Sequence, residues 1–282
     1  MVHFVRLLIP LLAISVMSTP KANPLLLNIA SFNIHYTVAK QSLDDWTPRR
    51  EAVTKVINQI DADIIAFQEM ETFAGGEFND QNIQLEWILK NAPHYSPAAV
   101  GNPEEYPSTQ PILYKTAILE PQQQGFFFFS KTPDTIYSEQ WNGGYPYFCS
   151  WVLFEHKETN KQFYVYNVHN DYRSYRNRLK TSKLIVERVD KIKGETPVIV
   201  LGDFNEFVGL KTMNILEQSG LHIAEPTGST NRILGFSFLP AIDHFLASDK
   251  ATFKQAVKVW SGKIDGVYPS DHYPLSVQIG FE

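Results

Sequence analysis

The segment from Thr196 to Phe207, TPVIVLGDFNEF, constrains the fold more than any other part of the chain. Its four consecutive branched apolar residues are typical of a strand that is buried on both faces. Gly202 ends this run, and Asp203 and Asn205 follow with one residue between them, so in extended chain both side chains lie on the same side. An Asx-rich turn after a strand is the alternative interpretation. The pattern predicts an internal strand that presents a carboxylate and an amide together, as a site for a hard cation or a phosphate requires.

Other polar residues stand at the ends of segments that we expect to be strands, or directly beside such segments. The expected strands lie at 25–35, 64–67, 162–168 and 241–248, and a last strand follows residue 273. The polar residues are Asn33, Glu69, His169, Asp171, Asp243, Asp271 and His272. The first two strands flank a helix with an apolar stripe at 51–60, and ligand sites of α/β folds lie at such strand ends. The sequence therefore predicts one shared site, and its predominance of oxygen ligands favours Mg²⁺ or Mn²⁺ over zinc.

The remaining pattern predicts a hairpin and two further helices. A run from Cys149 to Phe154 is expected to pair with the strand at 162–168. The apolar stripe of 174–193 predicts the longest helix of the chain, and a shorter helix is expected at 210–219, followed by an irregular loop. Cys149 is the single cysteine, which precludes an intrachain disulfide.

Six of these motifs carry a resemblance to a known family. SFNIH, AFQEM, NVHND, GDFNEF, IDHFLAS and SDHYP occur in an order and at intervals that resemble the endonuclease/exonuclease/phosphatase superfamily, with its deoxyribonuclease I-like fold. Each motif is weak alone, but GDFN and SDHYP together with the other four are specific. The resemblance implies an α/β fold over 25–282 as a single domain: a four-layer sandwich of two face-to-face mixed β-sheets flanked by helices. The family includes nucleases, inositol polyphosphate 5-phosphatases, neutral sphingomyelinases and deadenylases.

The resemblance also implies how a metal is held. By position in the motifs, Asn33 and Glu69 hold a divalent cation and Asp271 lies near it. Mg²⁺ is the expected ion, with Mn²⁺ as the alternative. A phosphodiester is anionic and resists attack by hydroxide, and a metal neutralises that charge and stabilises the leaving oxygen.

The implied catalytic residues are His169, Asp203, Asn205, Asp243 and His272. Asp203 and Asn205 are expected at the attacking water and the phosphoryl oxygens. His272, oriented by Asp243, is expected to transfer protons, because an imidazole held by a carboxylate titrates near neutral pH. His169 is expected to donate to a phosphate oxygen.

The expected phosphate contacts are Asn205, His169, Asp171, Arg173 and Arg176. Relatives often carry an arginine at the start of the strand YFCSWVLF, where this chain has Tyr147, so Arg173 or Arg176 is expected to compensate. Many relatives also carry a glutamate shortly before PILYK, where this chain has Ser108 or Gln110. These departures leave the substrate more open than the reaction.

The net charge limits the classes of binding partner that we expect. The net charge of −5 and the pI of about 5.9 do not suit a protein that holds nucleic acid on a broad basic surface, although a local groove can be basic. Nucleic acid, a lipid headgroup and a small phosphate ester all stay open as substrates. We expect a monomer.

The first 22 residues predict a secretory signal peptide. Arg6 precedes an apolar core from Leu7 to Met17, which is too short to span a bilayer, and small residues follow it. Cleavage is expected after Ser18 or after Ala22. An uncleaved anchor and a buried first strand are the alternatives. The signal implies a secreted or periplasmic protein with no stable membrane span once the signal is removed.

The sequence thus predicts an exported, metal-dependent phosphoesterase, most simply a phosphodiesterase that resembles nucleases. A sphingomyelinase-like lipid-headgroup phosphodiesterase and a small-molecule phosphatase are alternatives within the same class. The alternative of a different class is a non-catalytic secreted binding protein on the same scaffold. Such a protein is expected to have lost metal or proton-transfer positions, and all of these positions are filled here.

Overall fold

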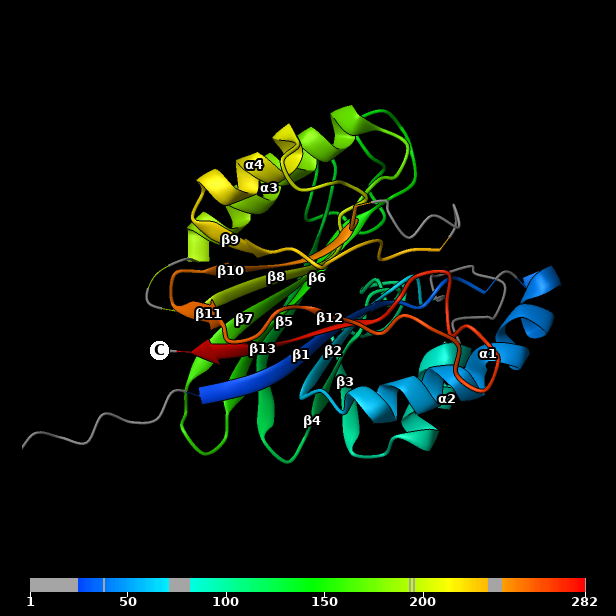
Figure 1. Cartoon of the computed structure of the whole chain (residues 1–282). Coiled ribbons are helices and arrows are strands. Elements are labelled where there is room, and N and C mark those ends of the chain that lie inside the picture. The colour runs from blue at the N-terminus through cyan, green and yellow to red at the C-terminus, as the bar shows by residue number, and fades with distance from the viewer. Residues whose placement is uncertain are drawn as a thin grey trace, which may run out of the picture.

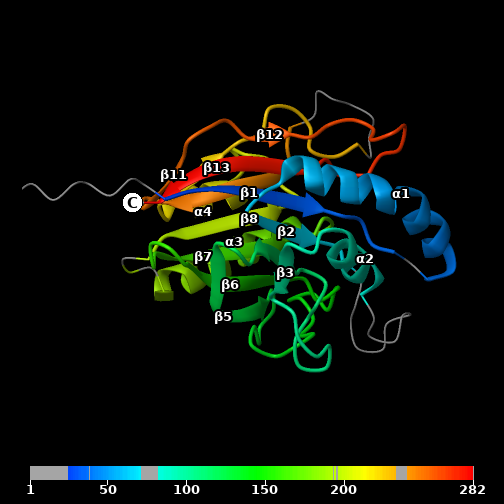
Figure 2. The ribbon, with the colours of Figure 1, turned by 90° about the horizontal axis from the view of Figure 1, so that it is seen from below.

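The protein is built from two mixed β-sheets that pack face to face (Figure 1). The computed structural model describes residues 25–37, 39–70, 82–192, 194, 196–232 and 240–281, with the backbone alone described for 39–45. Helices cover the outer face of each sheet (Figure 2), which confirms the predicted four-layer α/β sandwich. The signal peptide expected over residues 1–22 lies outside the described residues. None of the described helices is long and apolar enough to cross a membrane.

The first sheet has seven strands within the described residues, in the order β11-β13-β1-β2-β4-β3, with β12 paired to β13. Its strands are β1 (Leu25–Asn33), β2 (Ile64–Gln68), β3 (Tyr95–Ala98), β4 (Ile112–Lys115), β11 (Ala251–Phe253), β12 (Lys258–Val259) and β13 (Leu275–Phe281). Helix α1 (Ala39–Ile60) connects the parallel strands β1 and β2. Asn33 is in register with Gln68, so both strands end at the same edge of the sheet.

The second sheet has six strands in the described part of the chain, in the order β5-β6-β7-β8-β10-β9. They are β5 (Leu119–Phe128), β6 (Phe148–His156), β7 (Gln162–His169), β8 (Val198–Asp203), β9 (Leu221–Ala224) and β10 (Asp243–Ser248). Helix α3 (Tyr175–Ile192) connects the parallel strands β7 and β8. His169 is in register with Asp203, and Asp243 of the antiparallel β10 is in register with Asp203 from the other side. Three adjacent strands therefore deliver these residues to one edge.

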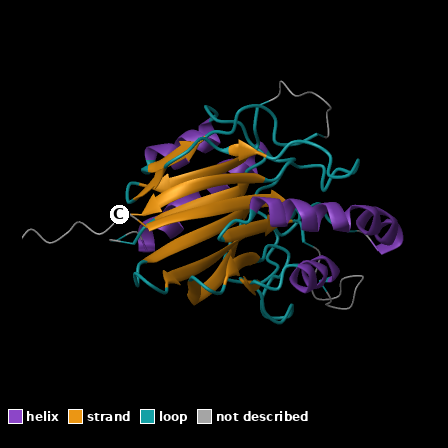
Figure 3. Ribbon diagram, turned by 60° about the horizontal axis from the view of Figure 1, so that its bottom comes forward, coloured by secondary structure: helices purple, strands orange, loops and turns teal. Residues whose placement is uncertain are grey.

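The branched run of β8 explains why its strand is central. Ile199 and Leu201 belong to the core between the two sheets. Val198 and Val200 belong to the core between the second sheet and the helices α3 and α4 (Lys211–Gln218). On the opposite side, α1 and α2 (Ile83–Asn91) cover the first sheet (Figure 3). A strand with apolar neighbours on both faces needs a continuous apolar sequence, as the segment has.

A few elements differ from the sequence-based expectation. Helix α1 has 22 residues and is longer than α3, which has 18 and was expected to be the longest. The stretch after α4 was expected to be irregular, yet it forms β9 at the edge of the second sheet. β11 and β12 are also short edge strands, of three and two residues. Segments this short cannot show a hydrophobic period. They form strands because they pair with a neighbouring strand.

Buried amides bridge the two sheets directly beneath the strand ends. Asn167 of β7 accepts a hydrogen bond from Gln68 of β2 at 2.7 Å and donates to the Phe67 carbonyl at 2.7 Å. Gln110 donates to the carbonyls of Phe148 and Asn167. These amide side chains are almost fully buried. Gln110, one candidate for the position of the family glutamate, is therefore part of a structural bridge between the layers.

Candidate active site

Asp203, Asn33 and Glu69 meet where β8, β1 and β2 end. Asn33 donates from Nδ2 to Oδ2 of Asp203 at 3.0 Å and to Oε1 of Glu69 at 3.1 Å. Nε2 of His169 lies 3.4 Å from the same Glu69 oxygen and 3.9 Å from Asp203 Oδ2. Asp203, Asn33 and His169 are buried, and the Glu69 side chain is 18% exposed. Residues from both sheets therefore share one centre, as the sequence predicted.

His272 and Asp243 form a pair on the other side of Asp203. Nδ1 of His272 lies 3.0 Å from Asp243 Oδ2, and the Thr230 hydroxyl donates to the same carboxylate. Because Nδ1 is directed at Asp243, Nε2 is the ring nitrogen that faces Asp203, at 3.8 Å from Oδ2. The predicted pairing of His272 with Asp243 is thus present in the geometry.

The proximity of these groups shifts their proton affinities. Burial raises the pKa of Asp203 to about 8, and the Asp243 and Glu69 carboxylates contribute to the same direction. Burial lowers the pKa of His272, but the carboxylates of Asp243 and Asp203 outweigh it and raise that pKa well above its ordinary value. Burial lowers the pKa of His169, which favours a neutral imidazole there.

The donor set suits a divalent cation. Glu69, His169 and Asp203 offer ligand atoms that all lie within 4.8 Å of one another, and Asp203, Asp243 and His272 form a second such group. Within the described residues, the ion-pair partners of these carboxylates are imidazoles and no lysine or arginine. Crowded carboxylates without a neighbouring lysine or arginine are the arrangement that a hard cation stabilises. Asn33, an expected ligand, directs Nδ2 at Glu69 and Asp203, while its Oδ1 accepts from the His35 amide at 3.1 Å.

His35 lies between Asp271 and Glu69 and contacts both carboxylates. His35 was not among the site residues expected from the sequence. Nδ1 of His35 is 3.2 Å from Asp271 Oδ2 and 3.8 Å from Glu69 Oε2. Burial raises the pKa of Asp271, but the hydrogen bond from His35 and the charge of His272 outweigh it and hold that pKa below its usual value. His35 has a φ of 66°, and Arg49 and Gln84 both donate to its carbonyl. The position of His35, two residues after Asn33 near the end of the same strand, could have marked it as a site residue.

Asn205 and Asp203 form the Asx turn that was the alternative interpretation of this segment. The Asn205 amide donates to Asp203 Oδ1 at 2.8 Å, and Asn205 has a left-handed φ of 49°. Its side chain donates to the Asn170 carbonyl at 2.9 Å. The turn is part of the site, because its hydrogen bond fixes the Asp203 carboxylate among the other site residues.

The residues expected to bind phosphate separate into different environments. Asp171 accepts from the amides of Arg173 and Ser174 and from Asn177 Nδ2, so its carboxylate caps the start of α3 instead of facing the reacting centre. Arg173 is exposed and donates from Nε to the Tyr172 hydroxyl at 2.6 Å. Arg176 is an exposed residue of the first turn of α3.

A cavity of about 370 Å³ is bounded by Tyr147, whose ring contacts His169. Its walls are formed by Asn142, Gly144, Tyr145, Tyr147, Asp171, Tyr172 and Arg173. Tyr147, which stands where relatives often carry arginine, packs its ring edge-on to His169 with 5.0 Å between centroids. Burial raises the pKa of Tyr147, so this wall is neutral at ordinary pH. Arg173 is the basic side chain among the cavity walls that the structure describes.

A family model described as the endonuclease/exonuclease/phosphatase family matches residues 26–272. The chain belongs to this family. Its members are hydrolases that act on phosphate esters, and the resemblance in the six motifs is confirmed.

Similar proteins support the fold. An uncharacterized protein of Acanthamoeba polyphaga mimivirus is 26% identical over 211 residues, which cover 72% of this chain and 76% of that protein. A family member from Bacteroides thetaiotaomicron has a similar structure, with a TM-score of 0.75 at 23% identity, covering 92% of this chain and 99% of that one. A mannosyl-6-phosphatase of the same organism has a TM-score of 0.73 at 23% identity, with 90% and 100% covered.

Proposed function

We propose that this protein is a divalent-metal-dependent phosphodiesterase in which water attacks the phosphorus. The observation that carries the proposal is the convergence of Glu69, His169 and Asp203 with the His272–Asp243 pair at one edge of two sheets. Glu69 and Asp203, with His169 or Asn33 beside them, are the residues that would hold Mg²⁺ or Mn²⁺. A bound cation would neutralise phosphate charge and stabilise the leaving oxygen.

Residues of the chain would then carry out the proton transfer. Asp243 holds Nδ1 of His272, which leaves Nε2 to exchange a proton with a group placed between it and Asp203. A bound cation would keep the Asp203 carboxylate ionised, and Asp203 would then be a neighbouring group that can accept a proton. His169 lies on the opposite side of Asp203 and offers a neutral imidazole to a phosphate oxygen.

The number of positive charges near the cavity supports a diester over a monoester. A phosphodiester carries one negative charge, whereas a phosphomonoester carries nearly two at neutral pH. The cavity bounded by Tyr147 has Arg173 as its basic residue, and the neutral Tyr147 stands at the position of the family arginine. A singly charged phosphate needs fewer positive partners, so this site suits a diester better.

A small-molecule phosphatase is the second candidate. The cavity of about 370 Å³ has the size of a small organic group, and three tyrosines line it. The mannosyl-6-phosphatase with a similar fold shows that the scaffold accommodates such a substrate in another protein. A phosphomonoester with a ring-shaped organic group is the substrate that this candidate would take.

We also propose that the protein is exported. The support is the basic residue and short apolar core of residues 1–22. Amino-terminal sequencing of the protein from the medium or the periplasm tests this. A mature start after Ser18 or Ala22 is expected, and an intact residue 1 on a cell-retained protein would contradict it.

Hydrolysis of bis(p-nitrophenyl) phosphate and p-nitrophenyl phosphate, with EDTA and after addition of Mn²⁺ or Mg²⁺, tests the activity. We expect metal-dependent turnover with preference for the diester. His272→Ala should lower kcat by about 10²- to 10⁴-fold, the usual contribution of a positioned proton-transfer group. His222→Ala is the matched control, because His222 is an exposed imidazole with its own partner, Asp249. Absence of metal-dependent turnover in the wild type would favour the non-catalytic binding protein.

A further inference from the structure

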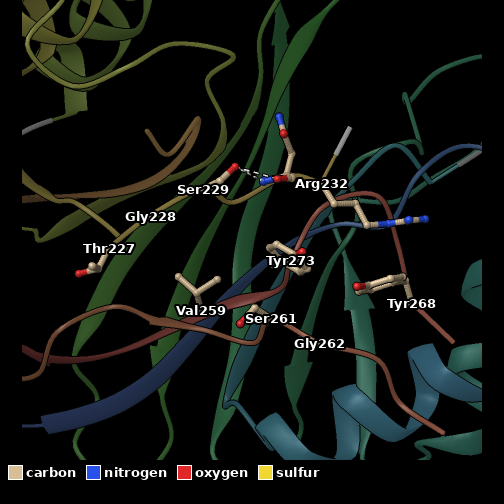
Figure 4. A pocket seen from close by; sticks show the side chains of 10 residues that line it. Thr227, Gly228, Ser229, Arg232, Val259, Ser261, Gly262, Tyr268 and Tyr273 are labelled. Atoms are coloured by element: carbon tan, nitrogen blue, oxygen red, sulfur yellow. Dashed lines mark hydrogen bonds between the residues drawn. The ribbon is translucent and has the colours of Figure 1, made fainter. Parts of the chain in front are cut away.

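A second cavity, of about 600 Å³, lies against Tyr273 (Figure 4). Its walls are Thr227, Gly228, Ser229, Asn231, Arg232, Val259, Ser261, Gly262, Tyr268 and Tyr273. Arg232 and Tyr268 stand at one end of the cavity and Thr227 at the other (Figure 4). None of the residues proposed for the catalytic centre lines this cavity.

The cavity is positively charged and rich in hydroxyl groups. No aspartate or glutamate is among its described wall residues. Arg232 lies with its guanidinium carbon 4.4 Å from the centre of the Tyr268 ring, and Lys263 contacts the same ring at 5.3 Å. In the described part of the chain, the Arg232 guanidinium donates from Nε to the Ser270 carbonyl, and no carboxylate lies within ion-pair distance of it. The guanidinium therefore retains donors for an anion.

Residues of the cavity and of the catalytic centre lie on the same two extended segments, which pair with each other. Asn231 pairs with His272, the Arg232 amide donates to the Asp271 carbonyl, and the Tyr273 amide donates to the Thr230 carbonyl. Thr230 and His272 point to Asp243, whereas Asn231 and Tyr273 line the cavity.

We propose that this cavity is a second binding site, for a phosphate-like anion, with Arg232 as its charged contact and the surrounding hydroxyl and amide groups as its hydrogen-bonding partners. Guanidinium groups are suited to phosphate because their fixed N–H fork can donate two parallel hydrogen bonds. The anion has two possible sources: a second acidic group on the substrate, or free phosphate. The substrate source rests on the proposed function, whereas the free-phosphate source does not.

Binding of inorganic phosphate to the protein in EDTA, measured by titration calorimetry, tests the site without catalysis. Without a cation, the carboxylates of the catalytic centre repel phosphate, so the cavity is the expected site of binding. Arg232→Ala should weaken binding by about tenfold or more, since charge-assisted hydrogen bonds are lost. Arg232→Lys should weaken binding less, because it keeps the charge but loses the fork. Lys183→Ala, which removes an exposed cation from α3, is the matched control and should bind as the wild type does.

A second variant keeps the test decisive if Arg232→Ala does not fold. Ser261→Phe places a large side chain at the exposed wall of the cavity and leaves Arg232 in place. It should also lose phosphate binding. Failure of the wild type to bind phosphate would overturn the proposal, and so would equal binding by the folded variants and the wild type.

The source of the anion is then assigned with two dinucleotides in Mn²⁺. Thymidylyl-thymidine has one diester phosphate, and its 5′-phosphorylated form adds a second anionic group. If the substrate supplies the anion, Arg232→Ala raises KM for the phosphorylated dinucleotide alone. If free phosphate is the ligand, both dinucleotides keep their KM in Arg232→Ala. If neither dinucleotide is hydrolysed, the result counts against the proposed phosphodiesterase activity. The phosphate titration still tests whether the cavity binds an anion.

Discussion

Asp243 determines which nitrogen of His272 faces Asp203. Replacing it with asparagine keeps the shape but removes the charge that raises the His272 pKa. We expect Asp243→Asn to lower kcat by about 10²- to 10⁴-fold and to move the His272 pKa toward about 6.5. A pH–rate profile and an NMR titration of the His272 ring measure the two effects. An unchanged His272 pKa would show that Asp243 does not control this imidazole.

The site could be predicted where a local pattern fixes the direction of a side chain. The branched run before Asp203 defines a buried strand, and the alternation of that strand defines where the carboxylate points. The capping role of Asp171 could not be predicted in the same way, because an aspartate after a strand serves equally as a ligand or as a helix cap. The direction of α3 decides between the two.

The conformation of His35 was also not predictable from its own segment. Its left-handed backbone depends on donors from Arg49 of α1 and Gln84 of α2, which are distant in sequence. When the position of a side chain depends on three separate elements, predicting it requires the tertiary structure.

At the scale of elements, the bridge between the sheets holds β2 and β7 in register beneath the site. Asn167→Ala removes the nearest acceptor of the buried Gln68 amide, which keeps only longer hydrogen bonds to Ser31 and Ala66, and it removes a donor to the Phe67 carbonyl. We expect a loss of about 2–4 kcal/mol in the free energy of unfolding, because each buried polar group left without a partner costs about 1–3 kcal/mol. Urea unfolding measures it. Asn91→Ala, at an exposed position of α2, is the control and should change stability by less than about 0.5 kcal/mol.

A loss under about 1 kcal/mol for Asn167→Ala would mean that water replaces the bridge without cost. The buried strands around this bridge were predictable, because burial on both faces requires continuous apolar sequence. The short edge strands β9, β11 and β12 were not, because their sequences have no periodic signal and their formation depends on a neighbouring strand.

At the scale of the whole molecule, the crowded carboxylates make stability depend on pH and on metal. Asp203, His272 and His35 all have raised pKa values, so each binds its proton more tightly in the folded state. Stability then falls between about pH 3.8 and 8 because of Asp203, and above about pH 6.5 because of the two histidines. His169 and His244 have lowered pKa values, and their effect lies below that pH.

We therefore expect the melting temperature in EDTA to fall by roughly 2–6 °C between pH 6.5 and 8, for a loss of about 1–2 kcal/mol from Asp203. Mn²⁺ should remove most of this decrease, since a cation favours the ionised carboxylate. Differential scanning calorimetry with and without Mn²⁺ measures both. A melting temperature that rises over this interval in EDTA would contradict the sign. A monomer is expected in all these solutions, and light scattering checks it.

The central claim is that Glu69 and Asp203, from two different sheets, bind one divalent cation beside His272. Anomalous diffraction from crystals soaked in Mn²⁺ tests it most directly. We expect a strong manganese peak at bonding distance, about 2.0–2.6 Å, from a Glu69 carboxylate oxygen, and loss of that peak in Glu69→Gln. A peak elsewhere in the molecule, or none in a wild-type crystal that hydrolyses its substrate, would contradict the account.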